Sequence, residues 1–209
     1  MDSGPRLRRS YGGASAEVRV AERRARLMEA GLDLLGTAGL HGTTVRGVIE
    51  RARLTPRYFY ESFADLDTLV IEVYDTVVAE LRDASVTALL DAPKDTRDRV
   101  RAVITTIVDH FGDDPRKGRL VLAEAMASPA LMRRRLDTSH MFTDLMSGRA
   151  AGHEVSPELM LAARFIVGGF AETLNAWLQG DLESTREALV DGCTTLFMAN
   201  LATARTSHP

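Results

Sequence analysis

Apolar residues recur at intervals of three or four positions along most of this 209-residue chain, as in Leu69, Val73, Val77 and Leu81. This period places apolar side chains on one face of an α-helix. Alternation of apolar with polar residues, the pattern of a half-buried strand, is not sustained over a useful length. The sequence therefore predicts an all-α fold.

Helix starts are marked by capping side chains that directly precede prolines, in Thr55-Pro56, Asp114-Pro115, Ser128-Pro129 and Ser156-Pro157. The side-chain oxygen accepts a free amide, and proline fits the first turn because its missing N–H would be unpaired there. Together with the periodicity, these signals predict about nine helices. They span residues 16–38, 44–51, 55–62, 66–89, 97–111, 115–126, 129–149, 157–179 and 184–204.

The composition, with 45% hydrophobic and 26% charged residues, is that of a soluble globular protein. No stretch approaches 18 uninterrupted apolar residues, so we expect no membrane-spanning helix and no membrane partner. The first ten residues hold three arginines without a following apolar run, which argues against a secretory signal. Cys193 is the single cysteine, which excludes an internal disulfide and suits a reducing cytoplasm. We therefore expect a cytoplasmic protein.

Motifs of enzymes and cofactor sites are missing from the sequence: there is no H-E-x-x-H, G-x-S-x-G, G-x-G-x-x-G or P-loop pattern. We expect no catalytic residues, no cofactor and no metal site. Two alternatives stay open at this point. One is a helical module that binds nucleic acid or an acidic protein without a small-molecule inducer. The other is a helical enzyme with an unrecognised site in the methionine-rich region after residue 126.

Charge is distributed unevenly although the net charge is only −3. Residues 1–60 carry eleven arginines and six acidic residues, a balance of +5, and the remainder has a balance of −8. A basic N-terminal quarter on an acidic body favours an anionic partner, with nucleic acid ahead of a membrane.

Two short helices follow a longer amphipathic one in this basic quarter. We expect Thr43 to cap the helix 44–51, residues 52–54 to form a tight turn, and Thr55-Pro56 to open the second short helix. This is the layout of a helix-turn-helix.

The second short helix has two distinct faces at 100° per residue. Phe59 and Phe63 lie one turn apart and are expected to point into the core, which turns Arg57, Tyr58 and Glu61 outward. Outward side chains on such a helix reach base edges in a major groove, and groups on its flanks reach phosphates. The DNA contacts predicted from these faces are Thr44, Thr55, Arg57, Tyr58, Tyr60 and Ser62.

These segments resemble the N-terminal domain of the TetR family of transcriptional regulators. The resemblance runs from about Arg23 to Leu69 and is carried by Thr43-Thr44-Val45-Arg46, by Tyr58 to Phe63, and by Asp65 to Leu69. It implies a homodimer that reads a palindromic operator in double-stranded DNA and a larger helical domain that binds a small-molecule effector. It also implies one further DNA contact, Arg46 of the first short helix, to a base or a phosphate.

Two positions depart from the family pattern. Arg53-Leu54 stands where the turn usually carries Gly-Val, so the turn must accept a side chain. Leu66 replaces a lysine that often contacts phosphate, and we expect backbone amides near Asp65 to supply part of that contact. The arginines at positions 6, 8 and 9 form a basic arm, and whether this arm enters the minor groove or stays an idle tail is left open.

The expected organisation is a basic arm at 1–15, a DNA-binding domain at 16–65 and a ligand-binding and dimerisation domain at 66–209. The resemblance assigns the dimer interface to helices 157–179 and 184–204, whose small and apolar residues suit close packing. An apolar effector pocket is expected among the helices between 66 and 179. Its predicted ligand contacts are Phe111, Met126, Met141, Phe142, Phe165, Glu172, Asn175 and Trp177. The function predicted is a ligand-responsive repressor, released from DNA by a small, largely apolar ligand.

Overall fold

The structure is a computed structural model that describes residues 13–206, and every regular element in that range is a helix. The expected basic arm, with its arginines at positions 6, 8 and 9, lies almost wholly outside the described residues. The principal helices are α1 (Gly13–Gly42), α2 (Val45–Ala52), α3 (Pro56–Ser62), α4 (Leu66–Asp91), α5 (Thr96–Asp113), α6 (Pro115–Gly118), α7 (Pro129–Ser147), α8 (Pro157–Gln179) and α9 (Arg186–Thr206). The all-α prediction is confirmed.

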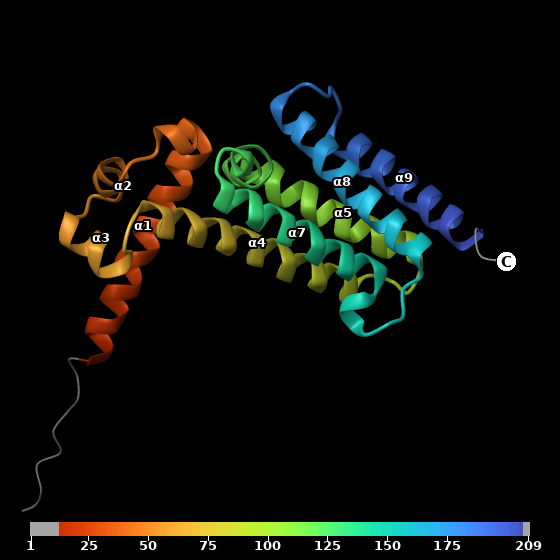
Figure 1. Ribbon diagram of the computed structural model, residues 1–209, viewed down its shortest axis with the longest axis horizontal. Coiled ribbons are helices and arrows are strands. Elements are labelled where there is room, and N and C mark those ends of the chain that lie inside the picture. Colours follow the sequence, from red (N-terminus) through yellow and green to blue (C-terminus); the bar gives the residue numbers. More distant parts are fainter. Residues whose placement is uncertain (1–12, 207–209) are drawn as a thin grey trace, which may run out of the picture.

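The helices are arranged as a small N-terminal unit and a larger bundle (Figure 1). Helices α1, α2 and α3 pack together at one end of the molecule. Helix α4 starts beside them and extends into the bundle, where it lies against α5 and α7. Helix α9 packs on α5 and α8, and α8 also packs on α7. Helix α4 therefore links the two ends of the molecule.

One continuous hydrophobic core runs through both ends. It includes Leu27 of α1, Phe59 of α3, Leu69 of α4 and Ile104 of α5, each at most 1% exposed. Burial of such side chains stabilises the fold by about 1.5–3 kcal/mol each. The N-terminal unit is thus attached to the bundle by packing, in addition to the chain connection.

The start of α2 differs from the prediction. Thr44, not Thr43, is the N-cap, and its side chain accepts a hydrogen bond from the Gly47 amide at 3.0 Å. Thr43 is buried, and its hydroxyl donates to the Gly39 carbonyl at 2.8 Å. Gly39 has φ 74°, so the chain bends there at the end of α1. That bend turns Thr43 inward, which the sequence pattern did not reveal.

Residues 115–126 do not form the single helix expected from the sequence. The one-turn α6 leads into a π-helical segment, η1 (Arg119–Ala123), and a 3₁₀ turn, η2 (Glu124–Met126). Single π turns occur mostly as insertions in α-helices, frequently at functional sites. The predicted helix 129–149 ends instead at Ser147, because Gly148 adopts a left-handed φ of 82°. A short 3₁₀ turn, η3 (Arg149–Ala151), follows.

Helix α8 is long and apolar enough, by length and mean hydropathy, to cross a membrane, and only 17% of its most apolar stretch is buried inside the protein. Arg164 and Glu172 divide the apolar residues of this helix, so the sequence shows no uninterrupted apolar run there. An exposed apolar helix of this kind needs a covering partner.

Candidate DNA interface and effector cavity

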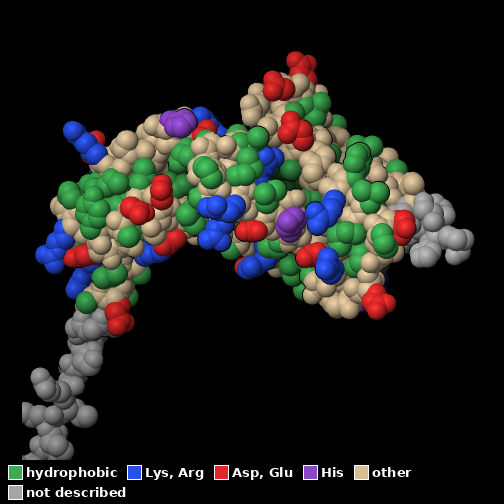
Figure 2. Space-filling view, viewed as in Figure 1, with side chains coloured by type: hydrophobic (Ala, Val, Ile, Leu, Met, Phe, Trp, Pro, Cys, Tyr) green, Lys and Arg blue, Asp and Glu red, His purple; other side chains and the backbone are tan. Residues whose placement is uncertain are grey.

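Helix α3 is oriented by its two phenylalanines, as the sequence predicts. Phe59 is 0% and Phe63 2% exposed, with their ring centroids 5.8 Å apart. Phe59 lies on the inner face of the seven-residue helix, and Phe63, the extended residue that caps its C-terminal end, packs beside it. The opposite face of the helix is therefore left outward. The Arg57 side chain on that face is 83% exposed. Basic side chains gather along the outer edge of this end of the molecule, at the left of Figure 2.

Arg57 and Tyr58 are both held by neighbours. Arg57 Nε donates to Glu61 Oε1 at 2.7 Å, and this hydrogen bond raises the pKa of the guanidinium. The Arg23 guanidinium of α1 lies over the Tyr58 ring, 4.3 Å from its centroid. Tyr58 is consequently half-buried, while Arg57 points freely outward. Glu61 thus orients Arg57 across the α3 surface.

The flanks of α3 carry further donors. Tyr60 is 61% exposed. Thr55 is exposed at the N-cap, where its hydroxyl makes no capping hydrogen bond. Ser62 is half-buried, and its hydroxyl donates to the Tyr58 carbonyl at 3.0 Å. Tyr60 and Thr55 therefore present free hydroxyls, whereas that of Ser62 is already engaged within the helix.

Helix α2 presents Thr44 and Arg46 beside α3. Thr44 is exposed and uses its oxygen as an acceptor for Gly47, which leaves its O–H to donate elsewhere. The Arg46 side chain is 89% exposed and pairs with Glu50 at 2.7 Å. An exposed pair of this kind opens at little cost.

The start of α4, where a phosphate contact is expected, is capped by an acidic side chain. Leu66 packs against the core, and the Asp65 carboxylate accepts hydrogen bonds from both the amide and the hydroxyl of Thr68 at 2.7 Å. The bonds from Thr68 lower the pKa of Asp65, so the carboxylate stays ionised. The Thr68 amide is therefore engaged within the chain, and the negative charge beside it disfavours a phosphate at that amide.

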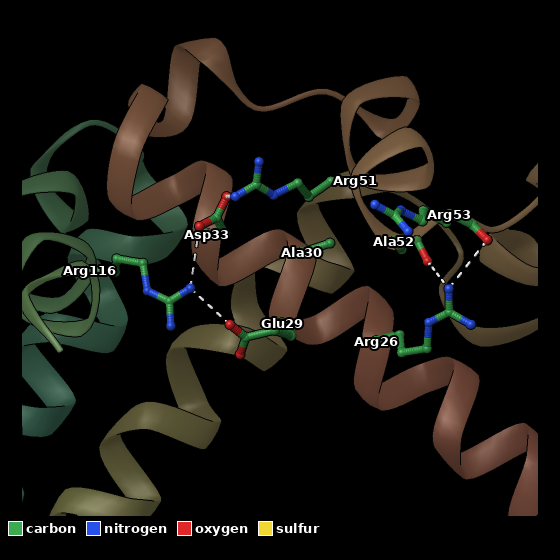
Figure 3. Close-up of a pocket in the computed structure, with 8 residues that line it drawn as sticks. All are labelled: Arg26, Glu29, Ala30, Asp33, Arg51, Ala52, Arg53 and Arg116. Atoms are coloured by element: carbon green, nitrogen blue, oxygen red, sulfur yellow. Dashed lines mark hydrogen bonds and ion pairs between the residues drawn. The ribbon is translucent and has the colours of Figure 1, made fainter.

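The turn between α2 and α3 is anchored by Arg26 of α1, a residue for which the sequence predicted no role. Arg53 has φ 53° and ψ 48°, a left-handed conformation, at the position where this turn usually carries glycine. Arg26 of α1 donates to the carbonyls of Ala52 and Arg53 (Figure 3). A cation at the C-terminal end of α2 satisfies free carbonyls and complements the helix dipole.

A second arginine joins α1 to α6 beside the same turn (Figure 3). Arg116 binds both carboxylate oxygens of Asp114 at 2.8 Å and reaches Glu29 at 2.8 Å and Asp33 at 3.4 Å. We call these four residues the α1–α6 junction. Gly36 faces Arg116 so closely that a Cβ there would overlap the Arg116 side chain. The junction thus combines ion pairing with tight backbone approach.

The residues after α6 extend this contact. Arg119 donates to the Thr37 carbonyl at 2.9 Å, and Glu124 accepts the Leu40 amide at 2.8 Å. Arg119 and Glu124 also pair with each other at 3.2 Å. The irregular segment 115–126 therefore contacts α1 through residues near both ends of the segment. Arg116 binds Glu29 and Asp33, and Glu124 binds the Leu40 amide.

We expect Arg116→Met to lower the free energy of unfolding by about 1–3 kcal/mol, because carboxylates at the junction lose charged hydrogen bonds. The Arg116 hydrogen bond lowers the pKa of Asp114. Its stabilising contribution is therefore full above the unfolded pKa of about 3.9 and is lost as the pH falls below it. Urea unfolding at neutral pH and near pH 3 measures both effects, and the variant should lose less stability on acidification.

Arg82→Met is the matched control, because Arg82 pairs at the surface with its neighbour Asp83. It should change stability by less than about 0.5 kcal/mol. An Arg116→Met variant as stable as this control would show that the junction contributes nothing.

The bundle encloses a cavity of about 850 Å³ between α4, α5, α7, α8 and α9, within the size range of small-molecule sites. Its wall is mostly apolar, with Ile104, Ile107 and Phe111 of α5 facing Phe142 of α7 and Phe170 of α8. Val121 and Leu122, from the π-helical segment, close the end nearest the N-terminal unit.

The predicted ligand contacts divide into two groups. Phe111 and Phe142 line the cavity. The other six, which lie outside its wall, are Met126, Met141, Phe165, Glu172, Asn175 and Trp177.

Exposure or other hydrogen bonds explain why four of these six residues lie outside the cavity wall. Met126 is 62% and Phe165 69% exposed. Trp177 donates its indole N–H to the Ser184 carbonyl at 3.0 Å, and Asn175 accepts from Gln179 at 3.1 Å. Helical periodicity located the apolar faces without showing which of them face one another.

Three cavity groups were missed: Arg99 of α5, Arg135 of α7 and the Tyr74–Thr138 pair, whose hydroxyls are 3.2 Å apart. A signal for Arg99 existed. It lies four residues before Val103 and eight before Ile107, so it stands on the apolar stripe of an amphipathic helix.

Other candidate chemistry finds little support in the described part of the chain. Cys193 is buried, and burial raises the pKa of its thiol, which disfavours a reactive thiolate. Between residues 13 and 206 no three His, Cys, Asp or Glu side chains are grouped as a metal site would require.

The fold and the exposed α2–α3 face define a helix-turn-helix transcriptional regulator. No family model matches the chain. The HTH-type transcriptional regulator BetI of Burkholderia cenocepacia is 31% identical over 177 residues, covering 80% of this chain and 88% of that protein. BetI of Paraburkholderia phymatum is 28% identical over 166 residues, covering 77% and 82%. The chain belongs to the TetR family of transcriptional regulators.

Solved structures share the fold. A TetR-family regulator from Streptomyces coelicolor superposes with a TM-score of 0.74 at 17% identity, covering 90% of this chain and 83% of that one. A TetR-like regulator from Rhodococcus sp. RHA1 gives 0.71 at 18% identity, covering 94% and 99%. The fatty acid degradation regulator FadR from Bacillus halodurans gives 0.72 at 16% identity, covering 84% and 94%.

Proposed function

We propose that this regulator is a cytoplasmic repressor that binds a palindromic DNA operator as a homodimer and is released by a small, largely apolar ligand. Residues 16–65 form the DNA-binding domain, with Arg57 and Tyr58 reading bases. Thr44, Thr55 and Tyr60 bind phosphates, together with Ser62 once its hydroxyl turns outward, and Arg46 contacts a base or a phosphate. Residues 66–209 bind the ligand and the second subunit. Family membership disfavours the alternative of an interaction module without an inducer.

The observation that carries this proposal is the segment 115–126, which contacts both the cavity and the N-terminal unit. Val121 and Leu122 line the cavity, while Arg116, Arg119 and Glu124 bind α1. A ligand that displaces Val121 or Leu122 therefore shifts the groups that fix α1. It weakens DNA binding only to the extent that it binds the two arrangements unequally. Helix α4 carries the same displacement to the recognition helices, because it lines the cavity and packs on α1.

The dimer is supported by an exposed apolar surface on α8 and α9. Leu161 is 72%, Phe165 69% and Leu196 64% exposed, and a Cβ at Gly168 or Gly169 would meet nothing within 4 Å. Apolar side chains are visible at the surface over this helix pair in Figure 2. Small residues beside large apolar ones allow close helix approach between two copies. We call Leu161, Phe165 and Leu196 the α8–α9 face.

Selection of bound sites from random duplex DNA tests the DNA-binding part of the proposal. We expect an inverted repeat with half-sites about one helical turn apart, since a two-fold dimer presents its recognition helices to adjacent major grooves.

The double variant Arg57→Ala/Tyr58→Ala should bind the selected site at least about thirtyfold more weakly, because each base contact contributes about 1–3 kcal/mol. Its affinity for unrelated duplex should change much less. Arg82→Ala, a surface arginine on α4 paired with Asp83, is the control. Unchanged selectivity in the double variant would remove these two residues from the reading surface.

A further inference from the structure

The effector cavity contains an arginine whose charge is not matched inside the protein. Arg99 lines the cavity from the first turns of α5, and its Nε is buried without a hydrogen-bond partner. In the range of side chains that the structure describes, no carboxylate lies within ion-pair distance of Arg99. The Arg99 residue as a whole is half-buried, so the burial concerns its Nε–H. A buried donor without a partner is unfavourable, and an anion that enters the cavity would supply the acceptor.

The rest of the cavity wall carries no negative charge that could match Arg99. It includes a second arginine, Arg135 of α7, and contains neither Asp nor Glu. The remaining polar groups are hydroxyls, most of them already bonded: Tyr74 with Thr138, Ser147 with the Asp144 carbonyl, and Ser156 with the Leu159 amide. An apolar cavity with positive charge and no negative charge selects an anion over a cation or a neutral molecule.

The cavity is also elongated along α5. Its α5 lining runs from Thr96 to Phe111, about 22 Å at 1.5 Å per residue. Arg99 stands near one end of this row. Phe111 stands at the other end, against Gly118, which directly precedes the π-helical segment with Val121 and Leu122. A ligand anchored at Arg99 thus extends its apolar part toward the segment that contacts α1.

We propose that the effector is an elongated amphiphile with one anionic head, a carboxylate or a phosphate monoester, bound by Arg99, and an apolar tail lying along α5. This inference rests on the proposed function, because it names the ligand class of the same cavity. The guanidinium offers its buried Nε–H and a terminal N–H to two oxygens of the head group. The tail replaces water against Ile104, Ile107 and Phe142.

Direct binding to the DNA-free protein tests the ligand class. The probes are dodecanoate, dodecyl phosphate and dodecanol, each titrated below its micelle concentration by calorimetry. We expect one or both anions to bind at least about tenfold more tightly than the alcohol, with one molecule per chain, since a charged hydrogen bond contributes about that factor. The affinity of dodecanoate compared with that of dodecyl phosphate shows whether a carboxylate or a phosphate head group is preferred.

Arg99→Met should remove the preference for the anions and leave the affinity for dodecanol unchanged. The variant should also melt at a higher temperature than the wild type without ligand, because it removes an unpartnered buried donor, whereas loss of a structural contact would lower the melting temperature. Arg97→Met is the control, because Arg97 lies on the same turn but is exposed and contacts Thr195 at 3.4 Å. It should keep the anion preference.

Equal affinities for the anions and the alcohol, no binding of either anion, or an anion preference that survives in Arg99→Met would each overturn the inference. These titrations are carried out without DNA, so their results do not depend on whether the protein is a repressor. Anion binding through Arg99 without release of the selected operator would support the ligand class and contradict the proposed repressor mechanism instead.

Discussion

Replacing Phe59 by Ala should lower the free energy of unfolding of the N-terminal unit by about 3–5 kcal/mol and abolish DNA binding. Phe59 is 0% exposed and packs against Phe63, whose ring centroid lies 5.8 Å away. The truncated side chain leaves a cavity between α3 and the helices on which it packs, α1 and α2. A helix of seven residues has too few hydrogen bonds to hold its orientation without that packing. The whole DNA-reading face then loses its fixed direction.

Urea unfolding followed by circular dichroism, together with binding to the selected operator, measures this effect. We expect the variant to show an early transition for α1–α3, while the cavity still binds its ligand. Tyr60→Ala is the matched control, because Tyr60 is an aromatic residue of the same helix but 61% exposed. It should cost less than about 1 kcal/mol of stability. A Phe59→Ala loss no larger than that of the control would contradict the role assigned to the buried ring.

The difference between these two neighbouring aromatics illustrates why the DNA-binding unit could be predicted from sequence. The direction of a side chain on a short helix follows from its position at 100° per residue once one apolar pair is assigned to the core. Thr55-Pro56 marks the start of α3, and Phe59 with Phe63 fixes its rotation. The sequence also showed that the turn after α2 must accept a side chain at Arg53, and the structure adds that this residue is left-handed. Each of these inferences uses residues within a few positions of each other.

Features that depend on contacts between distant segments were not predictable in this way. The π-helical break in 115–126 places Arg116 against α1 and Val121 against the cavity, and neither neighbour is local in sequence. The cavity wall comes from five long helices and the segment 119–123, so periodicity alone misassigned Phe165, which lies on an apolar face that points outward. Arg99 was visible only as a charge on an apolar stripe.

The outward apolar face that contains Phe165 leads to the second large effect. Phe165→Glu should raise the dissociation constant of the homodimer at least about a hundredfold. In a two-fold interface each substitution occurs twice, so two buried rings, worth about 1.5–3 kcal/mol each, are lost together. Two carboxylates then face each other or remain desolvated, which adds to the cost. The chain itself should stay folded, since Phe165 is 69% exposed in the monomer.

Sedimentation analysis over a range of protein concentrations measures the dissociation constant, and operator binding provides a second readout. A monomer engages one half-site, so operator affinity should fall steeply and lose its dependence on the spacing between half-sites. Leu90→Glu on α4 is the control, because Leu90 is 73% exposed but lies outside the α8–α9 face. Its dimer should be unaffected. If Phe165→Glu dimerised as tightly as Leu90→Glu, the subunit contact would have to lie elsewhere, and the exposed apolar residues of α8 would need a different partner.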